Sequence, residues 1–115
     1  MAIHWSAPWF AGVAEAGRAV QAAQAQGLPL PEALNRHAPG PLRAVSQSAL
    51  PDGQAYEAFI AATASVPTRE NLHDLFNGLI WHRFPDSKRQ LNRLQAQAIA
   101  ADGVGAVRGP LRDAI

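Results

Sequence analysis

Apolar and small residues recur at helical spacing near the beginning of the chain. One stripe of a helix would hold Phe10, Val13, Ala16, Gly17, Val20 and Ala23. This spacing predicts a helix over residues 10–26, and Gly27 is placed to end it as a C-terminal cap. The segment 4–10 is aromatic and interrupted by proline, so we expect an extended lead-in whose Trp5 and Trp9 dock on the core.

The middle of the chain has shorter and less regular patterns. Residues 31–37 predict a helix, because proline suits a first helical position. Residues 42–48 and 54–61 are the strand candidates, and the turn-forming segment 50–53 between them predicts a weak β-hairpin. The second candidate shows little of the apolar–polar alternation expected of a strand, and residues 56–60 also fit a helix.

Two longer helices are predicted in the second half of the chain. The first covers residues 69–83 and has Thr68 as its N-cap. The second begins at Asp86 or Ser87, and the two helices together should form an antiparallel hairpin over residues 69–101. The whole chain of 115 residues is therefore predicted as a single domain with a mostly helical α+β fold.

The predicted helix 69–83 has an apolar face and, beside it, an unusual polar face. The polar face holds His73, Asp74, Asn77 and Trp81. An ordinary surface helix shows Glu, Lys and Gln there, whereas short hydrogen-bonding groups beside an indole are typical of a buried network or a pocket. On the following helix, Lys88, Asn92 and Gln95 lie on one line.

Two interpretations of these residues stay open. In the structural one, His73, Asp74 and Asn77 form a buried hydrogen-bond network, and the chain is a non-catalytic module that binds another chain or a second copy. In the functional one, His73 and Asp74 are catalytic: His73 exchanges a proton as a general acid or base, and either Asp74 or Asn77 fixes its tautomer. The ligand would be a small or phosphate-bearing molecule, bound by Arg69, Asn71, Asn77, Trp81, Lys88, Asn92 and Arg112.

Composition excludes several classes of function. The chain has no cysteine, which excludes disulfides, thiol nucleophiles, thiolate zinc sites and iron–sulfur clusters. A net charge of +1 is too small to predict nucleic-acid binding, and no apolar run is long enough to span a membrane. The N-terminus lacks the features of a signal peptide, so we expect a cytoplasmic protein. Alanine accounts for 24 residues but is absent from residues 65–95, where the specific chemistry concentrates.

Two looser motifs give no better site. Residues 103–109 imitate a dinucleotide-binding loop, but Arg108 stands where the third glycine belongs, and the segment follows a predicted helix. His37, His73-Asp74 and Asp113 follow the order of ligands in an HD-type metal phosphohydrolase, a pattern so loose that many chains match it. We therefore predict no metal site and name no cofactor.

A longer run of residues resembles the signature of a known family. The run is Val66-Pro67-Thr68-Arg69-Glu70-Asn71-Leu72-His73-Asp74-Leu75-Phe76-Asn77-Gly78-Leu79-Ile80-Trp81, followed by Phe84-Pro85, Lys88, Leu91-Asn92 and Gln95. It resembles the domain of unknown function (DUF) family 3025, a set of bacterial, chiefly proteobacterial, proteins; Trp5, Tyr56-Glu57 and Arg108-Gly109-Pro110 also resemble its pattern. The resemblance implies no activity. Members of the family continue past the position of Ala114, so the chain resembles the N-terminal part of a longer protein.

Overall fold

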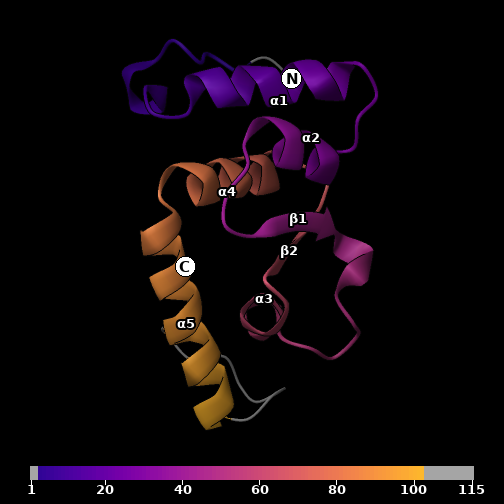
Figure 1. Cartoon of the computed structure of the whole chain (residues 1–115), viewed down its shortest axis with the longest axis vertical. Coiled ribbons are helices and arrows are strands. Elements are labelled where there is room, and N and C mark those ends of the chain that lie inside the picture. Colours follow the sequence, from indigo (N-terminus) through magenta and orange to yellow (C-terminus); the bar gives the residue numbers. More distant parts are fainter. Residues whose placement is uncertain (1–2, 103–115) are drawn as a thin grey trace.

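The computed structural model describes residues 3–102 and confirms the mostly helical α+β fold. In chain order, its elements are η1 (Pro8–Phe10), α1 (Ala14–Ala25), α2 (Leu30–His37), β1 (Arg43–Ser46), η2 (Gln47–Ala49), α3 (Tyr56–Thr63), β2 (Ser65–Thr68), α4 (Leu72–Arg83) and α5 (Pro85–Asp102). Figure 1 shows α1 across one end of the molecule, with α2, α4 and then the small sheet beneath it. Helix α3 lies toward the other end, and α5 runs beside it along the long axis. Helix α4 lies between these two ends and contacts both α2 and α5.

The sheet consists of two short parallel strands, so the predicted β-hairpin is wrong. Strands β1 and β2 pair in register over all four residues of each strand. Parallel strands cannot be joined by a tight turn, and the connection passes through η2 and α3. The segment 56–63 forms a helix because its large residues Tyr56, Phe59 and Ile60 are three and four positions apart, which places them on one helical face. Ala64 ends this helix in the left-handed conformation, with a φ of 55°.

Helix α1 buries the stripe that its spacing predicts. Its buried residues are Gly17, Val20 and Ala23. The helix begins at Ala14, later than predicted, because residues 8–10 form the separate 3-10 helix η1. Its end matches the prediction, since Gly27 follows it with a φ of 100° that favours glycine. Helix α2 then begins at Leu30 with a proline in its first turn, also close to the prediction.

The two tryptophans near the N-terminus have different environments. Trp5 is buried as predicted, and its Nε1 donates a hydrogen bond to Oε1 of Gln21 over 2.8 Å. Trp9 is 78% exposed, so the prediction that it docks on the core is wrong. The reason is the tight turn of η1, in which Phe10 packs against the core while its neighbour Trp9 faces solvent.

The N-cap of α4 is Asn71 and not the predicted Thr68. Oδ1 of Asn71 accepts a hydrogen bond from the backbone N–H of Asp74 over 2.8 Å. Thr68 cannot serve because it is the last residue of β2, and its hydroxyl donates to the backbone oxygen of Val66 over 2.9 Å. Residues 69–71 therefore form a loop that leads into the helix.

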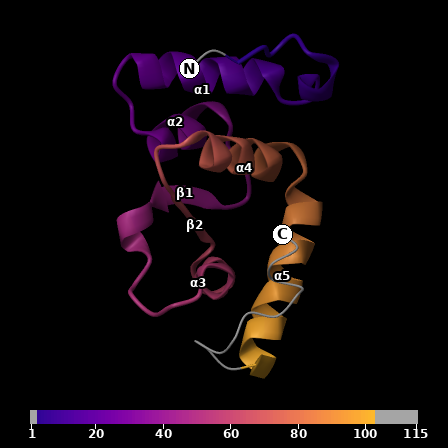
Figure 2. The same ribbon diagram turned by 180° about the vertical axis from the view of Figure 1, so that it is seen from behind.

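Helices α4 and α5 form a corner and not the predicted antiparallel hairpin. Helix α4 ends at Arg83, as predicted, and only Phe84 separates it from Pro85, the first residue of α5. One residue is too short a loop to reverse the chain, and proline suits a first helical position. Figure 2 shows the same relation as Figure 1: α5 leaves α4 at a steep angle and runs along α3. The predicted helix start at Asp86 or Ser87 therefore falls inside α5.

Two groups of buried apolar residues hold the elements together. The larger group joins α1, α2 and α4, and it includes Val20, Leu30, Leu34, Leu75 and Leu79. The smaller group joins α3, β2 and α4 through Ile60, Val66 and Trp81. Because α4 takes part in both, its remaining polar face is held in a fixed position. Over residues 3–102, no helix has the length and apolar character needed to cross a membrane.

Candidate functional site

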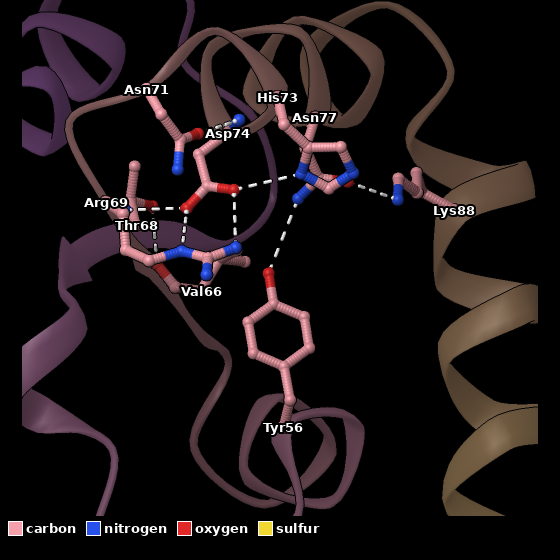
Figure 3. Close-up of polar contacts among 9 residues, drawn as sticks. All are labelled: Tyr56, Val66, Thr68, Arg69, Asn71, His73, Asp74, Asn77 and Lys88. Carbon is pink, nitrogen blue, oxygen red and sulfur yellow. Dashed lines mark hydrogen bonds and ion pairs between the residues drawn. The ribbon is translucent and has the colours of Figure 1, made fainter. Parts of the chain in front are cut away.

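The carboxylate of Asp74 is the centre of the polar contacts at the start of α4. Its Oδ2 accepts a hydrogen bond from the backbone N–H of Arg69 over 2.7 Å. The guanidinium of Arg69 also reaches it, with Nε 3.2 Å from Oδ2 and Nη2 3.3 Å from Oδ1 (Figure 3). The side chain of Asp74 is only 9% exposed, so these charge-assisted bonds form in a partly desolvated setting. They fix the loop 69–71 against the first turn of the helix.

Asp74 is held in its ionised form. Burial alone would raise its pKa, but the hydrogen bonds from Arg69 and His73 outweigh burial and hold the pKa below its usual value. The hydrogen bond to Asp74 in turn raises the pKa of Arg69. The carboxylate is therefore a permanent hydrogen-bond acceptor at neutral pH.

His73 stands at the edge of this cluster with most of its ring in solvent. Its side chain is 80% exposed, and its Nδ1 lies 3.1 Å from Oδ1 of Asp74. Because an ionised carboxylate can only accept, Nδ1 carries the proton and donates it. The lone pair of the neutral ring then lies on Nε2, for which residues 3–102 provide no hydrogen-bond partner. Asp74 thus fixes the tautomer of His73 and leaves its second nitrogen free to exchange a proton.

Asn77, one turn further along α4, links α5 to α3. Nζ of Lys88 donates to Oδ1 of Asn77 over 2.5 Å, and Nδ2 of Asn77 donates to the hydroxyl of Tyr56 over 3.4 Å (Figure 3). A lysine ammonium can only donate, so the amide oxygen faces α5 and the amide nitrogen faces α3. The side-chain amide of Asn77 on α4 therefore connects α3 and α5 through its two hydrogen bonds.

Burial changes the ionisation of both partners of this amide. It lowers the pKa of Lys88, against the attraction of Glu57. It raises the pKa of Tyr56, and the negative charges of Glu57 and Asp74 act in the same direction. Tyr56 is thus a neutral hydroxyl at ordinary pH, and Lys88 loses its proton more readily than an exposed lysine does.

Trp81 and Asn92 lie deeper than the other predicted site residues. Trp81 is buried against Ile60, although Nζ of Lys88 lies 5.8 Å from the centre of its ring. Asn92 is 2% exposed, and its Nδ2 donates to both the backbone oxygen and Oε1 of Glu57, each over 2.9 Å. Both side chains are therefore buried beneath the polar face and are not exposed on it. The predicted ligand-binding residue Arg112 lies outside the described residues.

Two cavities lie on other parts of the surface. A cavity of about 630 Å³ is bordered by α2, β1 and the end of β2, and its charged lining residues are Glu32, Arg43, Arg69 and Glu70. A second cavity, of about 360 Å³, is lined by both His37 and His82. Within residues 3–102, no group of three or more His, Asp or Glu side chains could hold a metal ion, and Asp113 lies outside that range.

Comparison with known protein families gives a match over most of the chain. Residues 42–115 match the sequence model of a family described as protein of unknown function, DUF3025. The chain belongs to this family. The matched range contains every predicted site residue, whereas Trp5, which also resembles the family pattern, lies before it. No curated protein and no solved structure gives a significant match.

Tyr56 and Glu57 contact predicted site residues but are not themselves among the residues that the sequence predicts for the site. The sequence alone places them in the strand candidate 54–61, where no pattern brings them toward the polar face of the later helix. The signal that could identify them is their place in the DUF3025 pattern, which they share with the residues they contact. In the structure, α3 packs against α5, which brings Glu57 to Asn92, and Tyr56 of α3 reaches Asn77 of α4.

Proposed function

We propose that the polar face formed by Arg69, His73, Asp74, Asn77 and Lys88 binds a small or phosphate-bearing ligand, with which His73 exchanges a proton. The observation that carries this proposal is the pairing of His73 with Asp74, which leaves Nε2 of His73 exposed to solvent. An imidazole with a fixed tautomer and one open nitrogen is suited to general acid–base catalysis. We place this activity in the bacterial cytoplasm, which the family resemblance and the cysteine-free sequence favour.

Two cationic side chains on this face favour an anionic ligand. The guanidinium of Arg69 is bonded to Asp74, but its side chain is 58% exposed, so donors remain for a ligand. Lys88 contacts Asn77, which lies one helical turn from His73. Phosphate and carboxylate oxygens accept hydrogen bonds from both kinds of donor.

The proposed chemistry uses the two nitrogens of His73 differently. Nε2 takes a proton from the ligand, and Asp74 stabilises the resulting imidazolium through its hydrogen bond with Nδ1–H. The charged ring can then return the proton to a leaving group. Asp74 stays ionised throughout because its pKa is lowered, and Arg69 holds the carboxylate in position.

A thermal-shift screen against inorganic phosphate, nucleoside monophosphates and sugar phosphates tests this proposal. We expect at least one of these anions to raise the Tm of the wild type and of His37→Ala, and to raise that of His73→Ala much less. His37 is a matched control because it is an exposed histidine on α2, outside the Asp74 cluster. Equal stabilisation of all three proteins, or stabilisation of none by any anion, would contradict the proposal.

A second candidate function is a protein-interaction module. It is favoured by α5, which buries Asn92 and Gln95 while Leu91 and Leu94 of the same helix are exposed. Apolar residues on the open face of a helix are typical of a surface that another chain covers. Size-exclusion chromatography with light scattering tests self-association: a dimer should dissociate in Leu94→Glu and persist in Gln97→Glu. A wild-type monomer at every concentration would count against it.

A further inference from the structure

Lys88 is the only lysine among the 115 residues, although the chain contains nine arginines. It lies at the polar face, with its Nζ against Oδ1 of Asn77. We propose that Lys88 is a nucleophilic amine that forms an imine with small aldehydes or 2-oxo acids. The inference deepens the proposed function, on which it rests for the location of the ligand, by adding a carbonyl group to the ligand class.

The surroundings of Lys88 favour a reactive amine. Among the described residues, its Nζ has no carboxylate within ion-pair distance, and its acceptor is the neutral oxygen of Asn77. The side chain is partly buried, so the ammonium loses hydration without gaining a close anionic partner. Such an amine is neutral more often than an exposed lysine, and only the neutral amine has a lone pair that can attack a carbonyl carbon.

Groups on α3 and α4 decide the charge of this amine. Glu57 of α3 attracts the ammonium from beyond ion-pair distance and opposes the effect of burial. Tyr56 of α3 is neutral and is connected to Lys88 through the amide of Asn77. Trp81 of α4 forms an aromatic wall, with its ring centre 5.8 Å from Nζ. Burial outweighs Glu57, since the pKa of Lys88 lies below its usual value.

The proposed reaction needs only two reactants, the amine of Lys88 and the carbonyl compound. The lone pair of neutral Nζ attacks the carbonyl carbon, a C–N bond forms, and the carbonyl electron pair moves to oxygen. A proton passes from nitrogen to that oxygen and gives a carbinolamine. The hydroxyl then leaves as water with the second proton of nitrogen, and a C=N bond remains. No oxidant or reductant takes part.

Reductive labelling of the whole chain with glyoxylate and cyanoborohydride tests the inference. Peptide mass mapping separates Lys88 from the N-terminal amine, and Arg93→Lys adds an exposed reference amine on the same helix. We expect Lys88 to be labelled faster at pH 7 than the reference amine, because the free-amine fraction grows as the pKa falls. Asn77→Asp should slow the labelling of Lys88, since a carboxylate beside Nζ stabilises the ammonium.

The outcomes separate this inference from the proposed function. Lys88→Arg keeps a cation at the site but removes the primary amine, so it should lose the labelling. Labelling of Lys88 no faster than that of the reference amine, with stabilisation by phosphate intact, would overturn imine formation alone. Fast labelling of Lys88 that Asn77→Asp slows, in a chain that no anion stabilises, would support imine formation and contradict the anion site. Circular dichroism confirms that each variant is folded.

Discussion

The backbone N–H of Arg69 donates to Oδ2 of Asp74 over 2.7 Å, and this bond turns the chain from β2 into α4. Asn71 completes the turn, because its Oδ1 accepts from the backbone N–H of Asp74 over 2.8 Å. The pair of bonds resembles a capping box in which the acidic side chain reaches past the N-cap residue to Arg69. The carboxylate of the candidate site therefore also holds the beginning of its helix.

Asp74→Ala should lower the free energy of unfolding by about 3 kcal/mol, because hydrogen bonds to charged groups contribute about 1.5–3 kcal/mol each. Arg69→Ala should lower it clearly less, since the backbone amide remains and the lost guanidinium is largely exposed. Urea denaturation followed by circular dichroism measures both values, with the exposed Asp86→Ala as control. Equal losses in the Asp74 and Arg69 variants would mean that the guanidinium, and not the backbone bond, holds the loop.

The same carboxylate should make the fold sensitive to acid. The pKa of Asp74 is lower in the folded chain than the value of about 3.9 in unfolded peptides, so the folded state binds fewer protons. Its stabilising effect is complete above about pH 5 and is lost as the pH falls through the unfolded and then the folded pKa. Asp74→Asn should therefore be less stable than the wild type at neutral pH, and the difference should shrink as the pH falls below the unfolded pKa of about 3.9. A stability difference that stays constant on acidification would contradict this assignment.

Asn35 of α2 takes the place of a neighbouring strand at the free edge of β1. Its Nδ2 donates to the backbone oxygen of Ala44, and its Oδ1 accepts from the backbone N–H of Ala44, both over 2.8 Å. Asn35→Leu has a similar size but leaves both backbone groups unpaired, so it should lower the free energy of unfolding by about 1–3 kcal/mol. Hydrogen exchange of the Ala44 amide should accelerate in Asn35→Leu and much less in Asn35→Asp, which keeps the acceptor. Unchanged protection in Asn35→Leu would rule out this role.

The spacing of apolar residues predicts the helices of this fold better than its sheet. Helices α1, α2 and α4 lie close to where the sequence places them, because each buries a stripe that the spacing alone reveals. Strand β2 has only four residues and contains Pro67, which argues against a strand inside a sheet. In a two-stranded sheet every strand is an edge, so the missing N–H of Pro67 is tolerated. Its pairing with β1 depends on the crossover through α3, which no local pattern encodes.

Within the candidate site, helical spacing predicts which residues share a face but not what each one contacts. His73, Asp74 and Asn77 do lie together, as their spacing requires. The backbone bond from Arg69 depends on the path of the loop before α4, which side-chain types alone do not determine. Lys88 reaches Asn77 across the corner at Phe84, although the predicted hairpin is wrong.

The indole of Trp5 lies so close to α1 that position 17 has room only for glycine, since a Cβ there would overlap the ring. Gly17→Ala should lower the free energy of unfolding by about 1–3 kcal/mol through overpacking, although alanine is favoured over glycine in helices by about 1 kcal/mol. Gly78→Ala should cost less, because its Cβ would meet the two terminal methyl groups of Leu34, which can change rotamer, whereas the ring of Trp5 is rigid. Thermal unfolding of Gly17→Ala in the wild type and in Trp5→Leu measures the coupling. The alanine should destabilise only the chain that keeps the indole, and an equal loss in both backgrounds would show that Trp5 is not the obstacle.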